Sequence, residues 1–451
     1  MAEVLFFIAL WVSKAVGLLL RLLGKNATQL PGRIAIIICP TFLTRLRKPA
    51  HIIAVTGTNG KTTTANMITD ALVLLRHQVT SNAFGSNLNH GVASALLRDA
   101  TLFGAARRDY GVFEVDEISV GKVLGPVHAD VVVVTNLFRD SIYRNAHPGY
   151  IAGFLDAGLP DDATLVLNGD DILVSGLRPS ASKRVFFSVS PLPGEPPSPP
   201  NLVIDARTCP RCDAELVFDF RRYHHIGRVH CPVCGYHSPS ADYLVTDASA
   251  GQLTLETYGI QSRYPLVDAG VTSIYNEVAV IAGLRELGLK SEDLARALAR
   301  VHVTDNRLEV IQAGGKRIVL QAAKGTPVAA SRVFADVSAG PGRKAVITFL
   351  DDAHDAADST ENITWLYDAD FELLVDPSIA QVVVGGKRHL DFALRLDLAG
   401  LPAERLVSVL DPKTTADLIE LSDIDTIYVL YDLFNGSTAH VIGQRLKERL
   451  A

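Results

Sequence analysis

A short loop at residues 57–63 has the residue types and spacing that bind the phosphates of a nucleotide. It follows an apolar run, leads into a helical pattern, and reads Gly57, Thr58, Asn59, Gly60, Lys61, Thr62, Thr63. Two glycines let backbone N–H groups turn toward phosphate oxygens, and the new helix adds partial positive charge. Lys61 can reach the β- and γ-phosphates, and the Thr62 hydroxyl can bind Mg²⁺. We predict ATP binding here; the alternative is a glycine turn that only closes a strand.

Carboxylates follow two of the later apolar runs. Glu114, Asp116 and Glu117 end the run at 110–115, and Asp140 follows the run at 129–135. Hard oxygen ligands at strand ends suit Mg²⁺, which keeps several waters and takes one or two carboxylates. Each acidic cluster taken alone could also be a solvated loop. Together with the glycine loop, they favour a Mg²⁺–nucleotide site.

Four of the five cysteines form two Cys-x-x-Cys pairs, namely Cys209, Cys212, Cys231 and Cys234. Two such pairs at this separation predict a zinc ribbon with four thiolate ligands. Four thiolates leave no open position on the metal, so the predicted zinc is structural. The alternative is a pair of redox-active dithiols. His225 and His230 lie between the pairs and are expected to be surface or packing residues rather than ligands. Metal-binding cysteines also indicate a reducing compartment.

The elements that must position these residues follow an α/β pattern. Apolar runs at 110–115, 129–135 and 164–168 alternate with helical stretches, which predicts a mostly parallel sheet covered on both faces. Ligands of such sheets bind beyond the carboxyl ends of the strands. A proline-rich linker at 191–200 precedes the cysteines, and a second α/β unit begins near residue 313.

Length and composition set further limits. A chain of 451 residues should form two or three domains. The net charge of −6 argues against a nucleic-acid partner bound by bulk electrostatics. Residues 5–23 are apolar but interrupted by Lys14, so we expect a helix rather than a signal peptide or a spanning segment. That helix either packs on its own domain or contacts a membrane surface.

Several motifs resemble the Mur ligases, and the combination resembles the MurT family, the ligase subunits of lipid II isoglutaminyl synthases. The glycine loop has the sequence pattern of the ATP loop of Mur ligases. That family tolerates a residue other than glycine, here Val55, where the general phosphate-loop pattern has its first glycine. Further similar stretches are 167–171, the Tyr275-Asn276 helix, the turn at 305–309, the segment 364–368 and the helical stretch 385–395. Only about fifty residues precede the loop, so we expect this chain to differ from ordinary Mur ligases in lacking their sugar-nucleotide domain. The stretch Lys324-Gly-Thr-Pro327 differs from the Lys-Asn-Pro sequence that is usual in the family.

The resemblance implies a fold and its boundaries. Residues 1–50 form an apolar helix and connector, and residues 51–312 form a Mur ligase-like ATP-binding domain. A zinc ribbon is inserted at about 203–240 of that domain, and residues 313–451 form a Rossmann-like α/β domain of the MurT type.

The resemblance also implies a reaction and the residues for it. ATP activates the α-carboxylate of D-glutamate in the lipid II stem peptide as an acyl phosphate. Ammonia from a glutaminase partner, GatD, then gives D-isoglutamine. The resemblance places this reaction in the cytoplasm, at the inner face of the membrane. Lys61 and Glu117 are candidate catalytic residues, Thr62, Glu114 and Glu117 candidate Mg²⁺ ligands, and Asn276 and Arg307 candidate nucleotide contacts. One of Asp352, Asp355 and Asp358 would serve the partner's glutaminase site. The alternatives are a ligase that adds an amino acid and an ATP-binding scaffold that regulates an amidotransferase.

Overall fold

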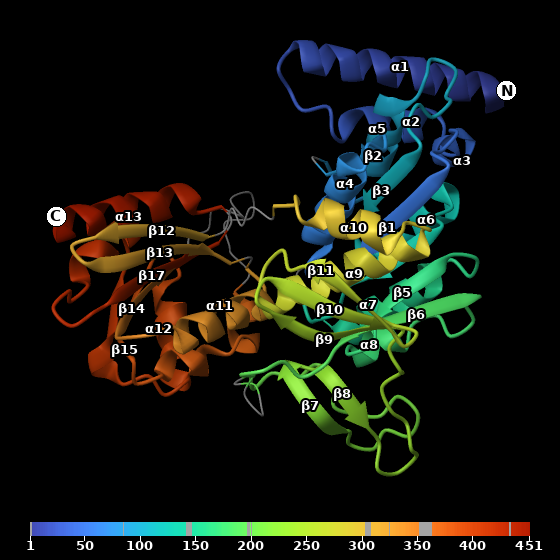
Figure 1. The fold of residues 1–451 in the computed structure, drawn as a ribbon. Helices are drawn as coiled ribbons and strands as arrows, with labels where there is room; N and C mark the ends of the chain where they lie inside the picture. Colours follow the sequence, from blue (N-terminus) through green and yellow to red (C-terminus); the bar gives the residue numbers. More distant parts are fainter. Residues whose placement is uncertain are drawn as a thin grey trace. The chain divides into compact units, whose positions relative to one another are not determined.

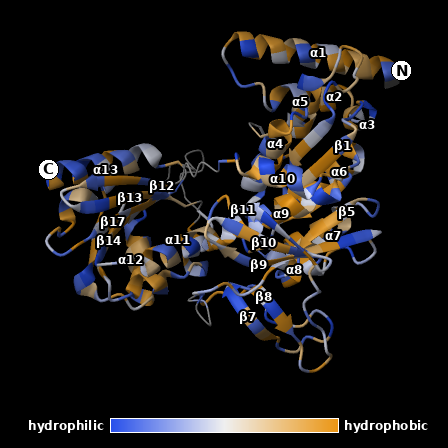
Figure 2. Cartoon of the chain, viewed as in Figure 1, coloured by the Kyte–Doolittle hydropathy of each residue, from blue (hydrophilic) through white to orange (hydrophobic). Residues whose placement is uncertain are grey.

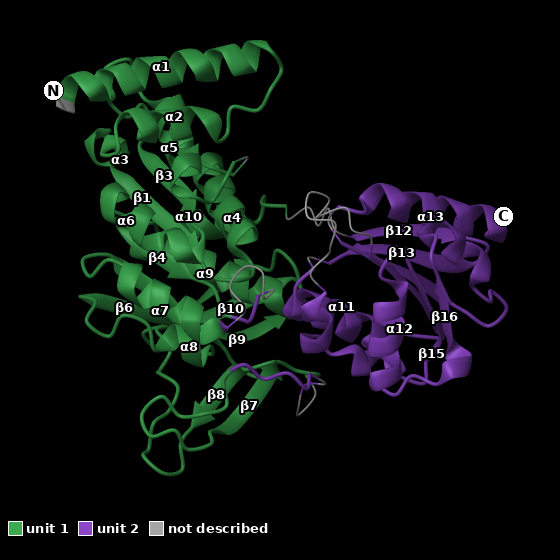
Figure 3. Cartoon of the chain, turned by 180° about the vertical axis from the view of Figure 1, so that it is seen from behind, with its two compact units in different colours: residues 1–137, 148–197, 206–303 green, residues 138–147, 198–205, 304–451 purple. Residues whose placement is uncertain are grey.

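The computed structural model of the chain divides into two compact units (Figure 3). Residues 1–137, 148–197 and 206–303 form the first unit, and residues 138–147, 198–205 and 304–451 form the second. The structure describes residues 2–83, 85–140, 147–195, 199, 201–302, 308–323, 325–350, 363–432 and 434–451. Residues 1–50 pack as part of the first unit.

The first unit is built on a nine-stranded sheet of order β11-β10-β9-β6-β5-β4-β1-β3-β2 (Figure 1). Neighbouring strands from β2 to β9 are parallel, and β10 and β11 continue the sheet in antiparallel fashion. The strands are β1 (His51–Thr56), β2 (Val79–Ser81), β3 (Tyr110–Glu114), β4 (Val131–Val134), β5 (Thr164–Asn168), β6 (Lys183–Val189), β9 (Tyr243–Ser249), β10 (Gln252–Thr257) and β11 (Ile260–Pro265). The predicted α/β fold with a mostly parallel sheet is confirmed, and β3, β4 and β5 coincide with the three apolar runs.

Helices cover both faces of this sheet because its central strands are apolar on both sides. Side chains alternate along β1, so that Ile52 faces one core and Ile53 faces Gly283 of α9 on the other side. The helices of the unit are α1 (Ala2–Leu22), α2 (Leu30–Ile38), α3 (Phe42–Arg45), α4 (Lys61–Leu74), α5 (Asn89–Asp99), η1 (Glu117–Ser119), α6 (Val120–Val127), α7 (Pro148–Gly158), α8 (Ile172–Ser175), α9 (Val271–Glu286) and α10 (Ser291–Leu298). Helices α1–α3 and α5–α7 share the core that contains Ile52.

A separate antiparallel hairpin, β7 (Val217–Tyr223) and β8 (Ile226–His230), carries the cysteine region of the first unit. Its core is small, with Ile172 of α8 packed against Cys209, Leu216, Val229 and Cys231. Few apolar side chains therefore stabilise the hairpin, so its fold depends on other interactions.

The second unit has a six-stranded sheet of order β12-β13-β17-β14-β15-β16, parallel except for the β12–β13 hairpin. Its elements are β12 (Leu308–Ala313), β13 (Lys316–Ala322), α11 (Pro327–Ala339), β14 (Lys344–Phe349), η2 (Thr364–Asp368), η3 (Phe371–Val375), β15 (Ile379–Gly385), α12 (His389–Leu398), η4 (Ala403–Arg405), β16 (Leu406–Val409), η5 (Pro412–Leu418), β17 (Thr426–Tyr431) and α13 (Gly436–Leu450). The boundary expected at residue 312 falls inside the β12–β13 hairpin, and the C-terminal segment of the second unit begins at residue 304.

Candidate functional site

The glycine loop lies at the carboxyl end of β1 and leads directly into α4. Gly57 has φ 123°, and a Cβ there would lie 2.3 Å from Oγ1 of Thr135. Gly60 has φ 81° and precedes the first residue of α4, Lys61. Both positions need glycine, because L residues avoid this backbone region and the first position has no room for a side chain. The local geometry is thus that of a strand, a tight loop and a helix N-terminus.

The end of β4 holds this loop in place. The N–H of Thr58 donates to the carbonyl of Asn136 (2.8 Å), and the N–H of Asn59 donates to Oδ1 of the same residue (2.9 Å). The Asn59 carbonyl accepts bonds from Oγ1 of Thr135 (2.7 Å) and Nδ2 of Asn136 (3.0 Å). β4 neighbours β1 in the sheet, so the polar residues after β4 fix the shape of the loop.

The candidate catalytic lysine and the candidate metal ligands meet beside the loop. Lys61 Nζ donates to the carbonyl of Gly57 (2.5 Å) and to Oε1 of Glu117 (3.2 Å), which is 5% exposed. The Thr62 hydroxyl donates to Oε2 of Glu114 (2.8 Å), whose other oxygen accepts a bond from Asn87 Nδ2 (3.3 Å). β1 and β3 pair with Val55 opposite Glu114, which brings these side chains together.

Two neighbouring residues have other surroundings. Asp116 caps η1 by accepting the N–H of Ile118 (3.3 Å), so its carboxylate has a local structural partner. Thr63 lies half-buried in the first turn of α4.

Asn276 of α9 lies against the glycine loop. A Cβ at Gly60 would be only 2.3 Å from Oδ1 of Asn276. The resemblance implied a nucleotide contact for Asn276, and in the structure its side chain borders the loop that would bind the phosphates. Arg307, Asp352, Asp355 and Asp358 lie outside the described residues.

The four paired cysteines converge at one end of the β7–β8 hairpin. Their sulfur atoms all lie within 4.8 Å of one another, with Cys209 to Cys234 and Cys212 to Cys231 both 3.5 Å apart. The backbone N–H groups of Cys234 and Val233 lower the pKa of the Cys231 thiol to about 6. Four converging sulfurs with one stabilised thiolate could hold a tetrahedral metal ion.

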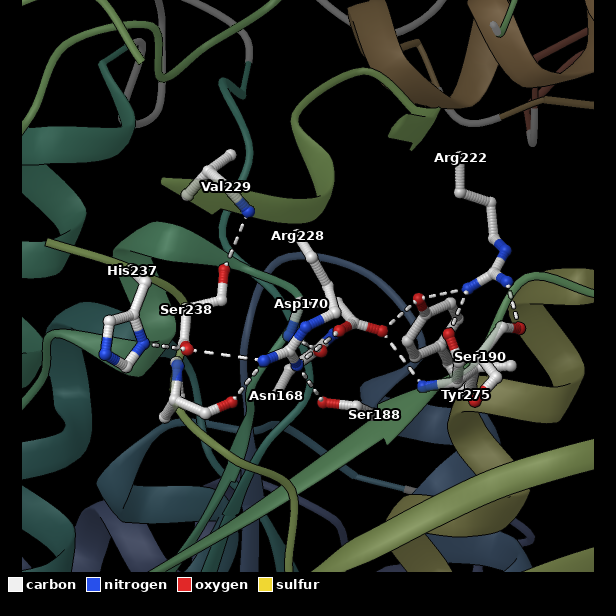
Figure 4. Close-up of polar contacts among 12 residues, drawn as sticks. Asn168, Asp170, Ser188, Ser190, Arg222, Arg228, Val229, His237, Ser238 and Tyr275 are labelled. Atoms are coloured by element: carbon white, nitrogen blue, oxygen red, sulfur yellow. Dashed lines mark hydrogen bonds and ion pairs between the residues drawn. The ribbon is translucent and has the colours of Figure 1, made fainter. Parts of the chain in front are cut away.

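A buried polar network joins this hairpin to the sheet, and the sequence analysis did not find its arginines (Figure 4). The Tyr275 hydroxyl donates to Oδ2 of Asp170 (2.6 Å), and Arg222 from β7 donates to the Tyr275 oxygen (2.6 Å) and to the Val189 carbonyl (3.0 Å). Arg228 from β8 lies 3.6 Å from Oδ1 of Asp170. Burial raises the pKa of the Asp170 carboxyl and that of Tyr275. No local sequence motif predicts that Arg222 and Arg228 lie near Asp170, because Asp170 is about fifty residues earlier in the chain.

Asp171 makes a second connection between the hairpin and the sheet. Asp171 accepts the N–H of Leu137 (2.8 Å), caps α8, and lies 3.3 Å from Nε2 of His225. His225 is fully buried, so it is a packing residue and not a surface one. The exposed His230 instead pairs with Asp219 at 2.7 Å.

Two family models and several known proteins match this chain in sequence. The family model "Mur ligase middle domain" matches residues 55–190, and "MurT ligase C-terminal" matches residues 324–433. The lipid II isoglutaminyl synthase (glutamine-hydrolyzing) subunit MurT of Staphylococcus aureus strain COL is 29% identical over 405 residues, 89% of each chain. The subunit of the same name from Streptococcus pneumoniae is 29% identical over 419 residues, 90% of each chain.

Solved structures share the fold at low sequence identity. A pseudomurein peptide ligase type C from Methanothermus fervidus has a TM-score of 0.68 and 16% identity, covering 91% of this chain and 81% of that one. MurF from Acinetobacter baumannii has a TM-score of 0.61 and 16% identity, covering 92% and 80%. These likenesses establish a Mur ligase fold.

Proposed function

Because the chain belongs to the MurT family of ligases, we propose that it amidates the α-carboxylate of D-glutamate in the lipid II stem peptide. The observation that carries this proposal is the meeting of Lys61, Thr62, Glu114 and Glu117 beside a glycine loop. This set has the cation, the hydroxyl and the carboxylates that phosphoryl transfer requires. The product would be D-isoglutamine, made for peptidoglycan synthesis at the inner face of the membrane.

The residues present fit ATP and Mg²⁺. The loop 57–63 offers backbone N–H groups and Lys61 to the phosphates, while Asn276 borders the loop and Arg307 remains a proposed nucleotide contact. Thr62, Glu114 and Glu117 would hold Mg²⁺, which neutralises charge on the phosphates when bound. Lys61 pairs with Glu117 in this structure, and on ATP binding it would exchange that partner for phosphate oxygens.

Activation is needed because a carboxylate has no good leaving group. Transfer of the γ-phosphoryl group to the D-glutamyl carboxylate gives an acyl phosphate, in which phosphate is the leaving group. Attack by ammonia then forms the amide and releases phosphate. The contribution of the protein would be positioning and charge stabilisation, with Lys61 and Glu117 as the proposed catalytic residues.

Ammonia would come from a separate glutaminase subunit of the GatD type. The names of the relatives contain both "glutamine-hydrolyzing" and "subunit", which supports a complex with such a partner. We propose that one of Asp352, Asp355 and Asp358 serves the partner's site.

The four cysteines are proposed to bind a structural zinc ion. Their converging sulfurs supply all four ligands of a closed tetrahedral site, so no position would remain for water or substrate. The small core of the hairpin supports a stabilising role for the metal.

Lys61→Ala tests the ligase proposal directly. The purified chain, the glutaminase, lipid II, ATP and glutamine are combined, and the product is followed by mass spectrometry. Loss of a preorganised cation should lower the rate of amide formation by about 10²–10³-fold. Lys122→Ala, an exposed lysine on α6, is the matched control and should keep the wild-type rate.

Three results would contradict the proposal. A product heavier by an amino-acid residue would indicate an amino-acid-adding ligase. If the chain still promotes the activity of its partner without ATP and after Lys61→Ala, it acts as a scaffold and not as a ligase. A product that does not require glutamine or ammonia would exclude amidation.

A further inference from the structure

Helix α1 is apolar on both its faces, but only one face is covered. Phe6, Leu10 and Ser13 lie on the buried face, packed against the rest of the first unit. Figure 2 shows apolar residues along most of α1, interrupted by a few hydrophilic ones. The exposed apolar side chains of the helix are Val4, Leu5, Ile8, Trp11, Val12, Leu18, Leu19 and Leu22. Both sets recur every three or four residues, so the exposed ones form a continuous face. A helix apolar all round is normally covered all round.

A neighbouring loop extends this apolar surface. The indole N–H of Trp11 donates to the carbonyl of Leu102 (2.9 Å), which places the loop beside the helix. Leu102 is 60% exposed and Phe103 is 79% exposed. Together with Lys14, Ala15 and Leu18 they line one shallow hollow. A contiguous exposed apolar patch of this kind marks an interaction site, whereas single exposed apolar residues do not.

The charge around this patch identifies its partner. Residues 1–50 contain seven lysines and arginines but one acidic residue, although the whole chain has a net charge of −6. Arg21 at the end of α1, Lys25 just beyond it, and Arg47 are exposed. The backbone N–H of Arg47 donates to the carbonyl of Gly104 at 3.0 Å, which places it beside the loop that carries Leu102 and Phe103. Arg21 and also Arg107 lie close enough to Lys14 that they add to the effect of burial in lowering its pKa. Positive charge beside an apolar face is complementary to an anionic lipid surface.

We propose that the outer face of α1, with Leu102 and Phe103, docks the protein peripherally on an anionic lipid bilayer. The helix is long and apolar enough to cross a membrane by composition alone. Its contacts favour a position on the surface, because Lys14 Nζ donates to the carbonyls of Leu97 and Ala100, both at 2.7 Å. A spanning helix would break these bonds and uncover the buried Ser13.

Docking at this face would bring the candidate ATP site near the lipid. Gly17 and Arg21 of α1 border a cavity of about 210 Å³ that reaches Asn82. Oδ1 of Asn82 accepts the N–H of Glu114 at 2.9 Å, so only one residue separates the cavity from a candidate metal ligand. A lipid-linked substrate would thus be met where it is embedded. The docking proposal itself does not depend on that substrate, because its test uses vesicles without lipid II.

Vesicle flotation of the full chain tests the docking face. The probes are vesicles of phosphatidylcholine alone and vesicles that also contain phosphatidylglycerol, at low and high salt. We expect at least tenfold tighter binding to the anionic vesicles, and weaker binding at high salt. The variant Leu19→Glu with Phe103→Glu should bind at least tenfold more weakly. Leu394→Glu on α12 is the matched control, since Leu394 and Leu19 are 51% and 57% exposed, and it should bind like the wild type.

Further readouts separate docking from misfolding and from other partners. The double variant should keep the wild-type thermal melting curve, because both positions are exposed. Leu10 is unsuitable as a probe, since it is fully buried and a charge there would disrupt packing. Equal binding by the double variant and the wild type would overturn the proposal. So would resistance of the bound chain to alkaline carbonate extraction, which indicates a spanning helix, or a vesicle-independent dimer abolished by Leu19→Glu.

Discussion

Glu277 of α9 holds a buried carboxyl group next to the candidate nucleotide contact Asn276. Its Oε2 accepts the N–H of Val267 at 3.0 Å, and the residue is 1% exposed. Burial is the main cause that raises the pKa of Glu277 to about 7, from a usual value of 4.5. Between these two pH values the folded state binds more protons than the unfolded state. Stability contributed by this group is therefore present at low pH and falls as the pH rises toward 7.

We expect Glu277→Gln to remove this pH dependence. The shift corresponds to about 3 kcal/mol, so the stability of the variant relative to the wild type should rise by roughly that amount between pH 4.5 and 8. Thermal unfolding at pH 5 and pH 8 measures the difference. Glu292→Gln, an exposed glutamate on α10, is the control. If the stability of the wild type and that of Glu277→Gln change with pH in the same way, ionisation of this carboxyl group does not destabilise the folded state.

At the residue scale, the sequence predicted the site where its chemistry is local. Gly57, Gly60 and Lys61 are contiguous because one loop must wrap phosphate groups, so their spacing is visible in the sequence. The contact of Asn276 with Gly60 depends on how α9 packs beside α4, which no local pattern specifies. The same holds for Arg222, whose partner Tyr275 lies on α9.

The β7–β8 hairpin is the element most dependent on a group outside the chain. Its core contains Cys209 and Cys231 and few other buried side chains. Metal-binding free energy acts as folding free energy in domains of this kind. Arg228 of β8 lies 3.6 Å from Asp170, and Arg222 of β7 is connected to Asp170 through the Tyr275 hydroxyl. Loss of the hairpin would therefore also remove both arginines from the surroundings of this buried carboxyl group.

We predict one zinc ion per chain, lost almost completely in Cys231→Ser. Zinc content is measured by inductively coupled plasma mass spectrometry, and the fold of the hairpin by its sensitivity to trypsin at Arg221. Removal of zinc by a chelator should increase cleavage there several-fold, since the apo hairpin lacks a sufficient core. Cys39→Ala, at a cysteine outside the cluster, should keep the zinc. Retention of zinc by Cys231→Ser would refute the four-thiolate site.

At the element scale, the strands that the sequence predicted are buried ones. β3, β4 and β5 coincide with the apolar runs at 110–115, 129–135 and 164–168, because strands covered on both faces need apolar side chains throughout. β12 has mostly exposed residues and β16 is only partly buried, so neither produces such a run. Their pairing with β13 and β15 is set by the sheet and not by their own composition.

The division of the whole molecule does not follow the order of the sequence. Residues 138–147 and 198–205 belong to the second unit, although they are flanked by segments of the first. Arg139 forms ion pairs with Asp205 and with Asp368 (2.6 Å) inside that unit. From the sequence we predicted domains made of contiguous residues. Composition and motifs do not show that short segments such as 138–147 and 198–205 belong to a unit formed mainly by residues much later in the chain.

Asp370 is the residue that fixes one of these inserted segments. It is fully buried, and its Oδ1 accepts the N–H groups of Leu202 and Val203, both at 3.0 Å. Oδ2 accepts Nδ2 of Asn201 at 3.0 Å. Hydrogen bonds to a charged group contribute about 1.5–3 kcal/mol each, and donors left buried without a partner add a further cost. The carboxylate therefore holds three successive residues to the second unit.

We predict that Asp370→Ala releases this segment while the first unit stays folded. Loss of the two backbone bonds should accelerate amide hydrogen exchange at Leu202 and Val203 by tenfold or more, since about 1.4 kcal/mol already corresponds to one factor of ten. Hydrogen–deuterium exchange mass spectrometry measures this on the full chain. Asp397→Ala, at an exposed aspartate of α12, controls for the loss of a carboxylate and should leave exchange unchanged. If Asp370→Ala exchanges like the control, the segment is held by its other contacts and not by this carboxylate.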